Sequence, residues 1–285
     1  MRRAGVRNWT SELSTAAAAS VLFWISRTLL SLLAAYPLLL AIQATGMVSG
    51  PEGDAVLFRP GSLLLLELLR VGGASLGAGL KLSLLLAAIA SVAGLVPLAF
   101  ALDLLSADDS RFSARVGRAL GLFPKFLGLG AIGLLAQAAL LLASSLLGAA
   151  LKALLQHQDE RLLSLLPLLT LGLGLLLCGW FGCVIDVARA ALVQEELSAR
   201  EALARALSCL RSQPYRLLVG AYPSVAGAAL AYTCALWVMT RLDLSGPSNV
   251  AIALAFGAHQ LAVLFAIGWR VRWLDTALEL SAESR

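Results

Sequence analysis

Charged residues are scarce in this sequence of 285 residues. Asp, Glu, Lys and Arg together make up 14% of the chain, and hydrophobic residues make up 59%. Soluble globular domains carry about 25% charged residues. The composition therefore excludes an ordinary soluble domain and predicts a membrane protein.

Histidine and cysteine are also few, with two histidines and four cysteines. A metal site needs several converging ligands, so we expect no metal and no other cofactor. The cysteines fall within apolar segments or in one polar segment, where we expect them to be small packing residues and not disulfides: Cys178, Cys183, Cys209 and Cys234.

Long apolar segments occupy most of the chain. The hydrocarbon core of a bilayer is about 30 Å thick, and a helix that spans it needs about 20 mostly apolar residues. Six segments meet this length: 28–46, 80–102, 125–147, 162–185, 216–239 and 249–268. We predict an all-α polytopic membrane protein with six transmembrane helices, in which residues 1–285 form a single integral membrane domain.

Lys and Arg gather on one side of these six segments, and such flanks face the cytoplasm. We therefore predict an inner-membrane protein with both termini cytoplasmic, and attribute the net charge of +5 to this side. Its expected partners are the bilayer and anionic lipid headgroups, with a membrane-protein partner also possible, and no nucleic acid. The candidate headgroup contacts are Arg111, Arg115, Arg118, Arg200, Arg205 and Arg211.

Two of the cytoplasmic segments have the pattern of amphipathic helices that lie along the membrane surface. In the second, Ser198 and Glu201 form a capping box and Pro214 ends the helix. Leu203, Leu207 and Leu210 fall on its apolar face. The first, 108–124, has the same design, with Asp108 or Asp109 as the cap and a break at Pro124.

The two cytoplasmic segments and the spans that follow them resemble each other. "RAL" and "PKFLGLGAIGLLAQAAL", ending at residue 140, parallel "RAL" and "PYRLLVGAYPSVAGAAL", ending at residue 230. Pro124 aligns with Pro214 and Gly130 with Gly220, although several Ala and Leu matches are expected by chance. This predicts a parallel internal repeat of residues 108–147 and 198–239.

On the outer side, residues 62–71 are too few to span a membrane and predict a short interfacial or partly re-entrant helix. A flexible corner is expected after it, at Gly72, Gly73, Gly77 and Gly79. The segment "GASLG" around Ser75 matches the pattern of hydrolase nucleophiles, but that motif needs a strand-to-helix turn, so we interpret it as part of the corner.

Three polar residues fall near the centres of apolar segments: Gln137, His259 and Gln260. Polar groups there are candidates for handling a substrate or a proton, or they form hydrogen bonds between helices. The third and sixth segments have no carboxylate at their centres, which favours the hydrogen bonds.

Asp186 and Arg189 lie one turn apart where the fourth segment ends. They could form a gating pair or a headgroup clamp, but the interpretation we favour is an ion pair at the membrane surface. The aromatic residues at segment ends predict an interfacial belt, with Trp24, Trp269, Trp273 and Tyr215 inside and Trp237 outside.

The stretch "VIDVARAALVQEELSAREALARALSCLRSQP", residues 184–214, carries a resemblance. It resembles the membrane domain associated with some glycerophosphodiester phosphodiesterases and related bacterial six-span proteins, over about residues 180–230, with "GDAVLFRPG" in support. The resemblance implies a six-helix membrane fold. It brings no catalytic residue with it, since this sequence has no phosphodiesterase catalytic domain.

These observations favour a non-enzymatic protein, a component or scaffold of a membrane complex. One alternative is a transporter or permease subunit for a small solute or lipid, with a path past the three central polar residues. A second alternative is a membrane-embedded lipid enzyme.

Overall fold

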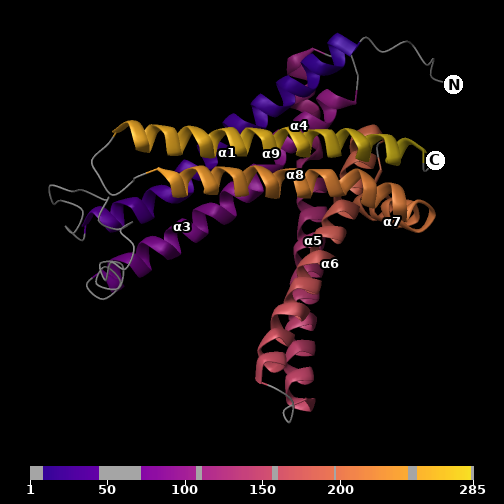
Figure 1. Ribbon diagram of the computed structural model, residues 1–285. Coiled ribbons are helices and arrows are strands. Elements are labelled where there is room, and N and C mark those ends of the chain that lie inside the picture. Colours follow the sequence, from indigo (N-terminus) through magenta and orange to yellow (C-terminus); the bar gives the residue numbers. More distant parts are fainter. Residues whose placement is uncertain are drawn as a thin grey trace. The chain divides into compact units, whose positions relative to one another are not determined.

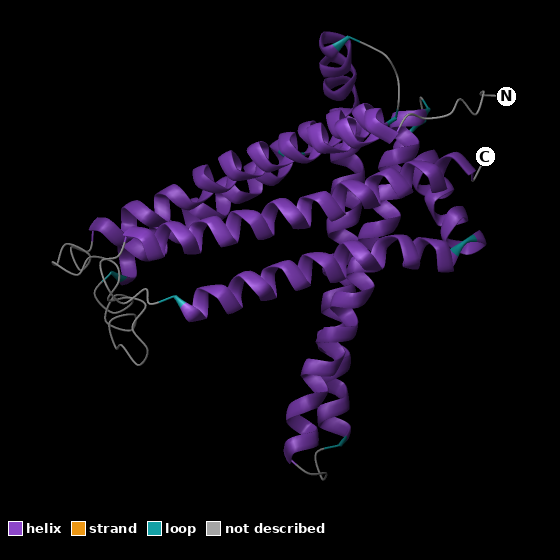
Figure 2. Cartoon of the chain, turned by 45° about the horizontal axis from the view of Figure 1, so that its top comes forward, coloured by secondary structure: helices purple, strands orange, loops and turns teal. Residues whose placement is uncertain are grey.

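The computed structural model describes residues 9–44, 72–106, 111–155, 160–195, 197–242 and 249–283. Within these ranges every regular element is a helix, which confirms the all-α prediction (Figures 1 and 2). The helices are α1 (Trp9–Ala44), α3 (Gly73–Ala93), α4 (Leu95–Leu105), α5 (Phe112–Leu154), α6 (Glu160–Gln194), α7 (Ala199–Ser212), α8 (Pro214–Arg241) and α9 (Asn249–Glu283). The predicted outer helix at 62–71 and the caps Asp108 and Asp109 lie outside the described residues.

Within the described ranges, six stretches of helix are long and apolar enough to cross a membrane: Ser14–Ala44, Gly73–Leu105, Phe112–Leu154, Leu165–Gln194, Pro214–Arg241 and Val250–Glu283. Each contains most of one predicted apolar segment, so the predicted number of spans is confirmed. The helices extend beyond the apolar segments because their polar flanks also stay helical. The fourth segment, for example, was expected to end at residue 185, but α6 continues to Gln194.

The chain divides into two compact units. Unit 1 consists of Met1–Ala101 and Pro223–Arg272, and unit 2 of Leu102–Tyr222 and Trp273–Arg285. Helices α4, α8 and α9 contribute residues to both units. The prediction that the whole chain forms one integral membrane domain stays a prediction.

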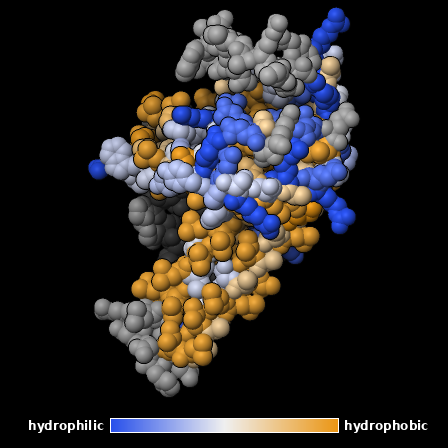
Figure 3. Space-filling view, turned by 90° about the vertical axis from the view of Figure 1, so that its right-hand side faces the viewer, coloured by the Kyte–Doolittle hydropathy of each residue, from blue (hydrophilic) through white to orange (hydrophobic). Residues whose placement is uncertain are grey.

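In unit 2, α5 and α6 lie side by side as a hairpin (Figure 1). Small residues spaced four apart line the contact, Ser144 and Gly148 on α5 and Thr170 and Gly174 on α6. A Cβ atom at Gly174 would lie only 2.7 Å from the Cβ of Ser144. This spacing of small residues lets membrane helices approach closely. The outer surface of the hairpin is covered by apolar side chains (Figure 3).

In unit 1, α1 packs against α3. A Cβ atom at Gly79 would lie 2.6 Å from the Cβ of Ala41 and 3.1 Å from the carbonyl oxygen of Pro37. The expected flexible corner is therefore wrong, because Gly73 to Gly79 form the first turns of α3 and Gly79 is in close contact with α1. Ser75 donates to the Gly72 carbonyl oxygen (3.0 Å) in the first turn of this helix.

The proline predictions have different outcomes. Pro214 is the first residue of α8 and follows the non-helical Gln213, so the predicted end of the surface helix is confirmed. The break predicted at Pro124 is wrong, because α5 runs through this residue without interruption. A proline inside a membrane helix is tolerated when neighbouring groups compensate for the lost backbone hydrogen bond. The internal repeat itself stays a prediction.

Candidate functional site

A buried carboxylate lies at the centre of the polar contacts in unit 2. Asp186 of α6 is 1% exposed. One of its oxygens accepts a hydrogen bond from the indole nitrogen of Trp273 (2.9 Å), and the other accepts from the Arg189 guanidinium (3.4 Å). An indole N–H can only donate, so a buried tryptophan needs an acceptor of this kind. Asp186 therefore joins α6 to the C-terminal part of α9.

The packing around this carboxylate explains its burial. Gly220 of α8 lies under the Trp273 ring, where an added Cβ atom would be 3.1 Å from the ring. On the other side, the Arg189 guanidinium carbon lies 6.0 Å from the ring centroid of Phe126, within the range of a cation–π contact. The missing side chain at Gly220 leaves room for the Trp273 ring, and the Phe126 ring lies against Arg189. Both partners of Asp186 are therefore packed against neighbouring residues.

This arrangement corrects two predictions. The Asp186–Arg189 ion pair is present, but Asp186 is buried and does not lie at an exposed helix end. Trp273, expected in the interfacial belt, is 1% exposed and belongs to the core of unit 2. The physical reason is the same for both, because α6 and α9 continue beyond the predicted spans and pack against neighbouring helices there.

Sequence reasoning missed a second buried carboxylate. Asp103 of α4 is 3% exposed, and its side chain accepts a hydrogen bond from Arg118 (3.1 Å). Arg115 donates to the backbone carbonyl oxygen of the same residue (3.2 Å). A lone acid at the end of an apolar run, followed 12 and 15 residues later by arginines, is the signal that could have indicated this contact.

The surface helix α7 begins as predicted. Ser198 Oγ accepts from the Glu201 backbone N–H, and the Ser198 backbone N–H donates to the Glu201 carboxylate (2.8 Å), so the capping box is confirmed. The hydrogen bond from this backbone N–H, supported by the Ser198 side chain, holds the pKa of Glu201 below its usual value.

Small residues form the side of α7 that packs within unit 2. The buried residues are Ala202, Ala206 and Cys209, whereas Leu207 is 38% exposed. Small side chains let α7 lie close to its neighbours in unit 2. The contact of the leucine face with a membrane surface stays a prediction.

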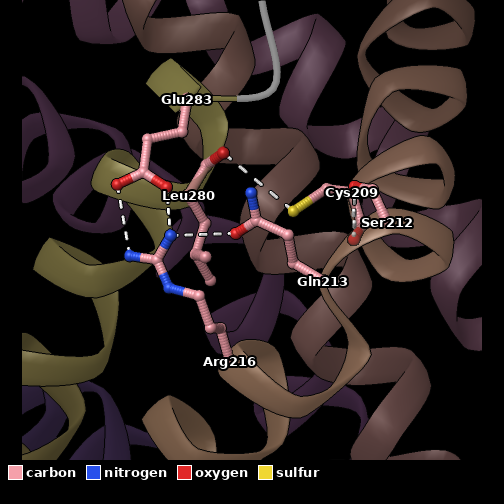
Figure 4. Close-up of polar contacts among 6 residues, drawn as sticks. All are labelled: Cys209, Ser212, Gln213, Arg216, Leu280 and Glu283. Carbon is pink, nitrogen blue, oxygen red and sulfur yellow. Dashed lines mark hydrogen bonds and ion pairs between the residues drawn. The ribbon is translucent and has the colours of Figure 1, made fainter.

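The end of α9 is tied to the turn between α7 and α8 (Figure 4). The Arg216 guanidinium donates to both oxygens of the Glu283 carboxylate and also to the Gln213 side chain. The Cys209 thiol points toward the Leu280 carbonyl oxygen at 4.0 Å. Burial raises the pKa of Cys209, so this thiol stays protonated at neutral pH.

The three central polar residues occupy different surroundings. In unit 2, the Gln137 side chain donates to the Cys178 carbonyl oxygen (3.1 Å), which links α5 to α6. In unit 1, Gln260 accepts a hydrogen bond from the Trp24 indole (3.0 Å), which links α9 to α1. His259 is exposed, and its ring centroid lies 6.3 Å from that of Tyr232. The contacts of Gln137 and Gln260 are hydrogen bonds between helices, as predicted, whereas the described contact of His259 is between aromatic rings.

The candidate headgroup arginines fall into two groups. Arg115, Arg118 and Arg205 are engaged within the protein, the last with Glu195 at 2.6 Å. The other three are exposed and form no ion pair with a described residue: Arg111, Arg200 and Arg211. Their contact with lipid stays a prediction.

Arginine, indole or backbone N–H groups donate to the carboxylates of Asp103, Asp186, Glu195, Glu201 and Glu283, which suits a structural role. Among the residues that the structure describes, no group of three or more His, Cys, Asp or Glu side chains is placed to hold a metal ion. Comparisons with protein-family models, with curated proteins and with solved structures find no match. The resemblance to the phosphodiesterase-associated membrane domain stays a prediction.

Proposed function

We propose that this chain is a non-enzymatic, multi-pass protein of the inner membrane and serves as a component or scaffold of a membrane complex. The observation that carries the proposal is that Asp186 of α6 is hydrogen-bonded to Trp273 of α9. This buried carboxylate has both oxygens engaged, by Trp273 and by Arg189. A group held in this way fixes helices relative to one another within unit 2, as a platform for other proteins requires.

The proposed topology places both termini and α7 in the cytoplasm. The distribution of Lys and Arg between the flanks supports it, because positive flanks are retained on that side. In this orientation the turn between α5 and α6 faces the opposite compartment. The exposed arginines near α7 then lie at the level of anionic headgroups.

The exposed side of α7 is the proposed contact surface for a protein partner. Arg200 and Arg211 are exposed, and Leu207 between them is 38% exposed. The opposite side is fixed to unit 2 through Ala202 and Ala206, so the helix is held in place before a partner binds. Arginine is enriched at protein interfaces, and the exposed Leu207 adds apolar area between the two arginines.

Purification of the tagged full chain from its native membrane in a mild detergent tests this proposal. We expect a stoichiometric partner that is retained by the wild-type chain and lost from the double variant Arg200→Glu, Arg211→Glu. The matched control is Lys81→Glu, which reverses the charge of an exposed cation in unit 1. A chain that migrates alone at native abundance, or a complex that the α7 variant leaves intact, contradicts the proposal.

A further inference from the structure

Unit 1 contains a groove that is lined by both polar and apolar side chains. The groove lies between α1, α8 and α9 and has a volume of about 500 Å³. Its polar lining residues are Arg27 of α1, Ser224 and Tyr232 of α8, and Arg270 of α9. Liquid water occupies about 30 Å³ per molecule, so the groove has room for on the order of ten water molecules.

The groove leads from one boundary of the apolar layer toward its centre. Because α8 ends at Arg241 and α9 begins at Asn249 a few residues later, depths along both helices can be counted from this end. At about 1.5 Å per residue, Ser224 lies about 25 Å and Arg270 about 31 Å from it, whereas Tyr232 lies only about 14 Å away. The hydrocarbon core of a bilayer is about 30 Å thick. One end of the groove is therefore at headgroup level, and Tyr232 is near mid-depth.

His259 extends the groove at mid-depth. It lies two helical turns from Ala266 on the same side of α9, and Ala266 lines the groove. Its ring centroid is 6.3 Å from that of Tyr232, another lining residue. His259 is exposed, and neither of its ring nitrogens forms a hydrogen bond with a residue that the structure describes. An imidazole has at least one N–H donor, which is costly to leave unpaired in hydrocarbon, so a histidine at this depth faces protein or water and not lipid.

We infer that the groove is a water-filled half-channel, which opens at headgroup level beside Arg27 and Arg270 and ends at Tyr232 and His259. Water in the groove supplies the hydrogen bonds of the His259 imidazole and hydrates the polar groups on the wall. An acyl chain in the same place would leave the His259 nitrogens without a partner. The half-channel admits water and small polar solutes to the centre of the membrane, a role that a scaffold does not include. It is independent of the contact surface proposed on α7.

Labelling of single cysteines with a charged, hydrophilic maleimide tests the half-channel. The full chain, with its native cysteines replaced, carries either Ala228→Cys in the lining of the groove or Ala229→Cys outside it. The reagent reaches both faces of permeabilised membrane vesicles, so the result does not depend on the proposed topology. The thiolate is the reactive form, and it does not form in hydrocarbon, so Ala228→Cys should react at least about tenfold faster than Ala229→Cys. Full exposure to water would give the opposite order, because Ala228 is half-buried and Ala229 is exposed.

A second pair of variants tests whether water reaches mid-depth. His259→Cys should be labelled, whereas Leu261→Cys should not, because Leu261 is 69% exposed on another side of α9. If His259→Cys does not accumulate in the membrane, Tyr232→Cys takes its place at the same depth. All variants should be labelled completely in SDS, which shows that each thiol is intact.

Three results overturn the inference. Slow labelling of Ala228→Cys, no faster than that of Ala229→Cys, shows that hydrocarbon fills the groove. Equal labelling of His259→Cys and Leu261→Cys shows that the groove does not determine access. Labelling of His259→Cys without labelling of Ala228→Cys shows that water reaches mid-depth by another route.

Discussion

Removal of the Asp186 side chain should destabilise unit 2 more than any change to an exposed ion pair. In Asp186→Ala, the Trp273 indole loses its acceptor and Arg189 loses a buried carboxylate. Breaking a buried ion pair by removing one partner costs about 3–5 kcal/mol, because the other partner loses an interaction that offset its desolvation. We expect a loss in this range in the free energy of unfolding.

Trp273→Phe removes the N–H group that donates to Asp186 together with part of the indole that lies over Gly220. Its loss of stability therefore combines a hydrogen bond to a charged group, about 1.5–3 kcal/mol, with lost packing. A double-mutant cycle with Asp186→Ala separates the two, because the packing loss at Trp273 is common to both backgrounds. The pair Glu195–Arg205, whose side chains are 25% and 24% exposed, provides a control, and Arg205→Ala should cost at most about 1 kcal/mol.

The assay is unfolding in mixed micelles with increasing SDS, followed by far-UV circular dichroism so that loss of a tryptophan does not change the signal. A double-mutant cycle between Asp186→Ala and Trp273→Phe should give a coupling energy of about 1.5–3 kcal/mol. A coupling near zero, or an Asp186→Ala variant as stable as Arg205→Ala, would refute the structural role of this carboxylate.

Three further predictions concern helix contacts and titrating groups. Gly79→Ala should destabilise the protein by about 1–3 kcal/mol, because the added Cβ atom meets Ala41. Gly77→Ala should be neutral or stabilising, because no atom lies within 4 Å of its added Cβ atom. Both variants are measured in the same SDS titration. Folding lowers the pKa of Glu201, so its capping contribution to stability should be complete above about pH 5. This contribution should be lost as the pH falls through the pKa of Glu201 in the folded protein. Glu201→Gln should remove this part of the acid dependence of α7 helicity. Cys209, buried and with a raised pKa, should react with N-ethylmaleimide at least about tenfold more slowly in the folded protein than in SDS, and equal rates would contradict its burial.

Features determined by local sequence could be predicted. The number of spans follows from the lengths of the apolar segments, and the start and end of α7 follow from Ser198, Glu201 and Pro214. Each of these signals acts over a few residues, through backbone hydrogen bonds or through the transfer of apolar groups out of water. They need no knowledge of which helices are neighbours.

Features determined by packing could not be predicted. Asp186 and Trp273 are 87 positions apart in the chain, and nothing local indicates that they meet. The packing side of α7 is defined by Ala202 and Ala206, because close approach favours small residues over the more hydrophobic leucines. At Pro124 a local helix-ending signal is overridden, and only the surroundings of α5 could reveal this.

The central claim is that the α5–α6 hairpin crosses the membrane and leaves α7 on the cytoplasmic side, where a partner can reach it. Single cysteines at Leu155, beside the turn of the hairpin, and at Ser212, the last residue of α7, test it in a chain whose native cysteines have been replaced. We expect an impermeant maleimide to label Leu155→Cys on intact spheroplasts and to label Ser212→Cys only after lysis. Labelling of Ser212→Cys on intact spheroplasts, or of both positions on the same side, would contradict the account.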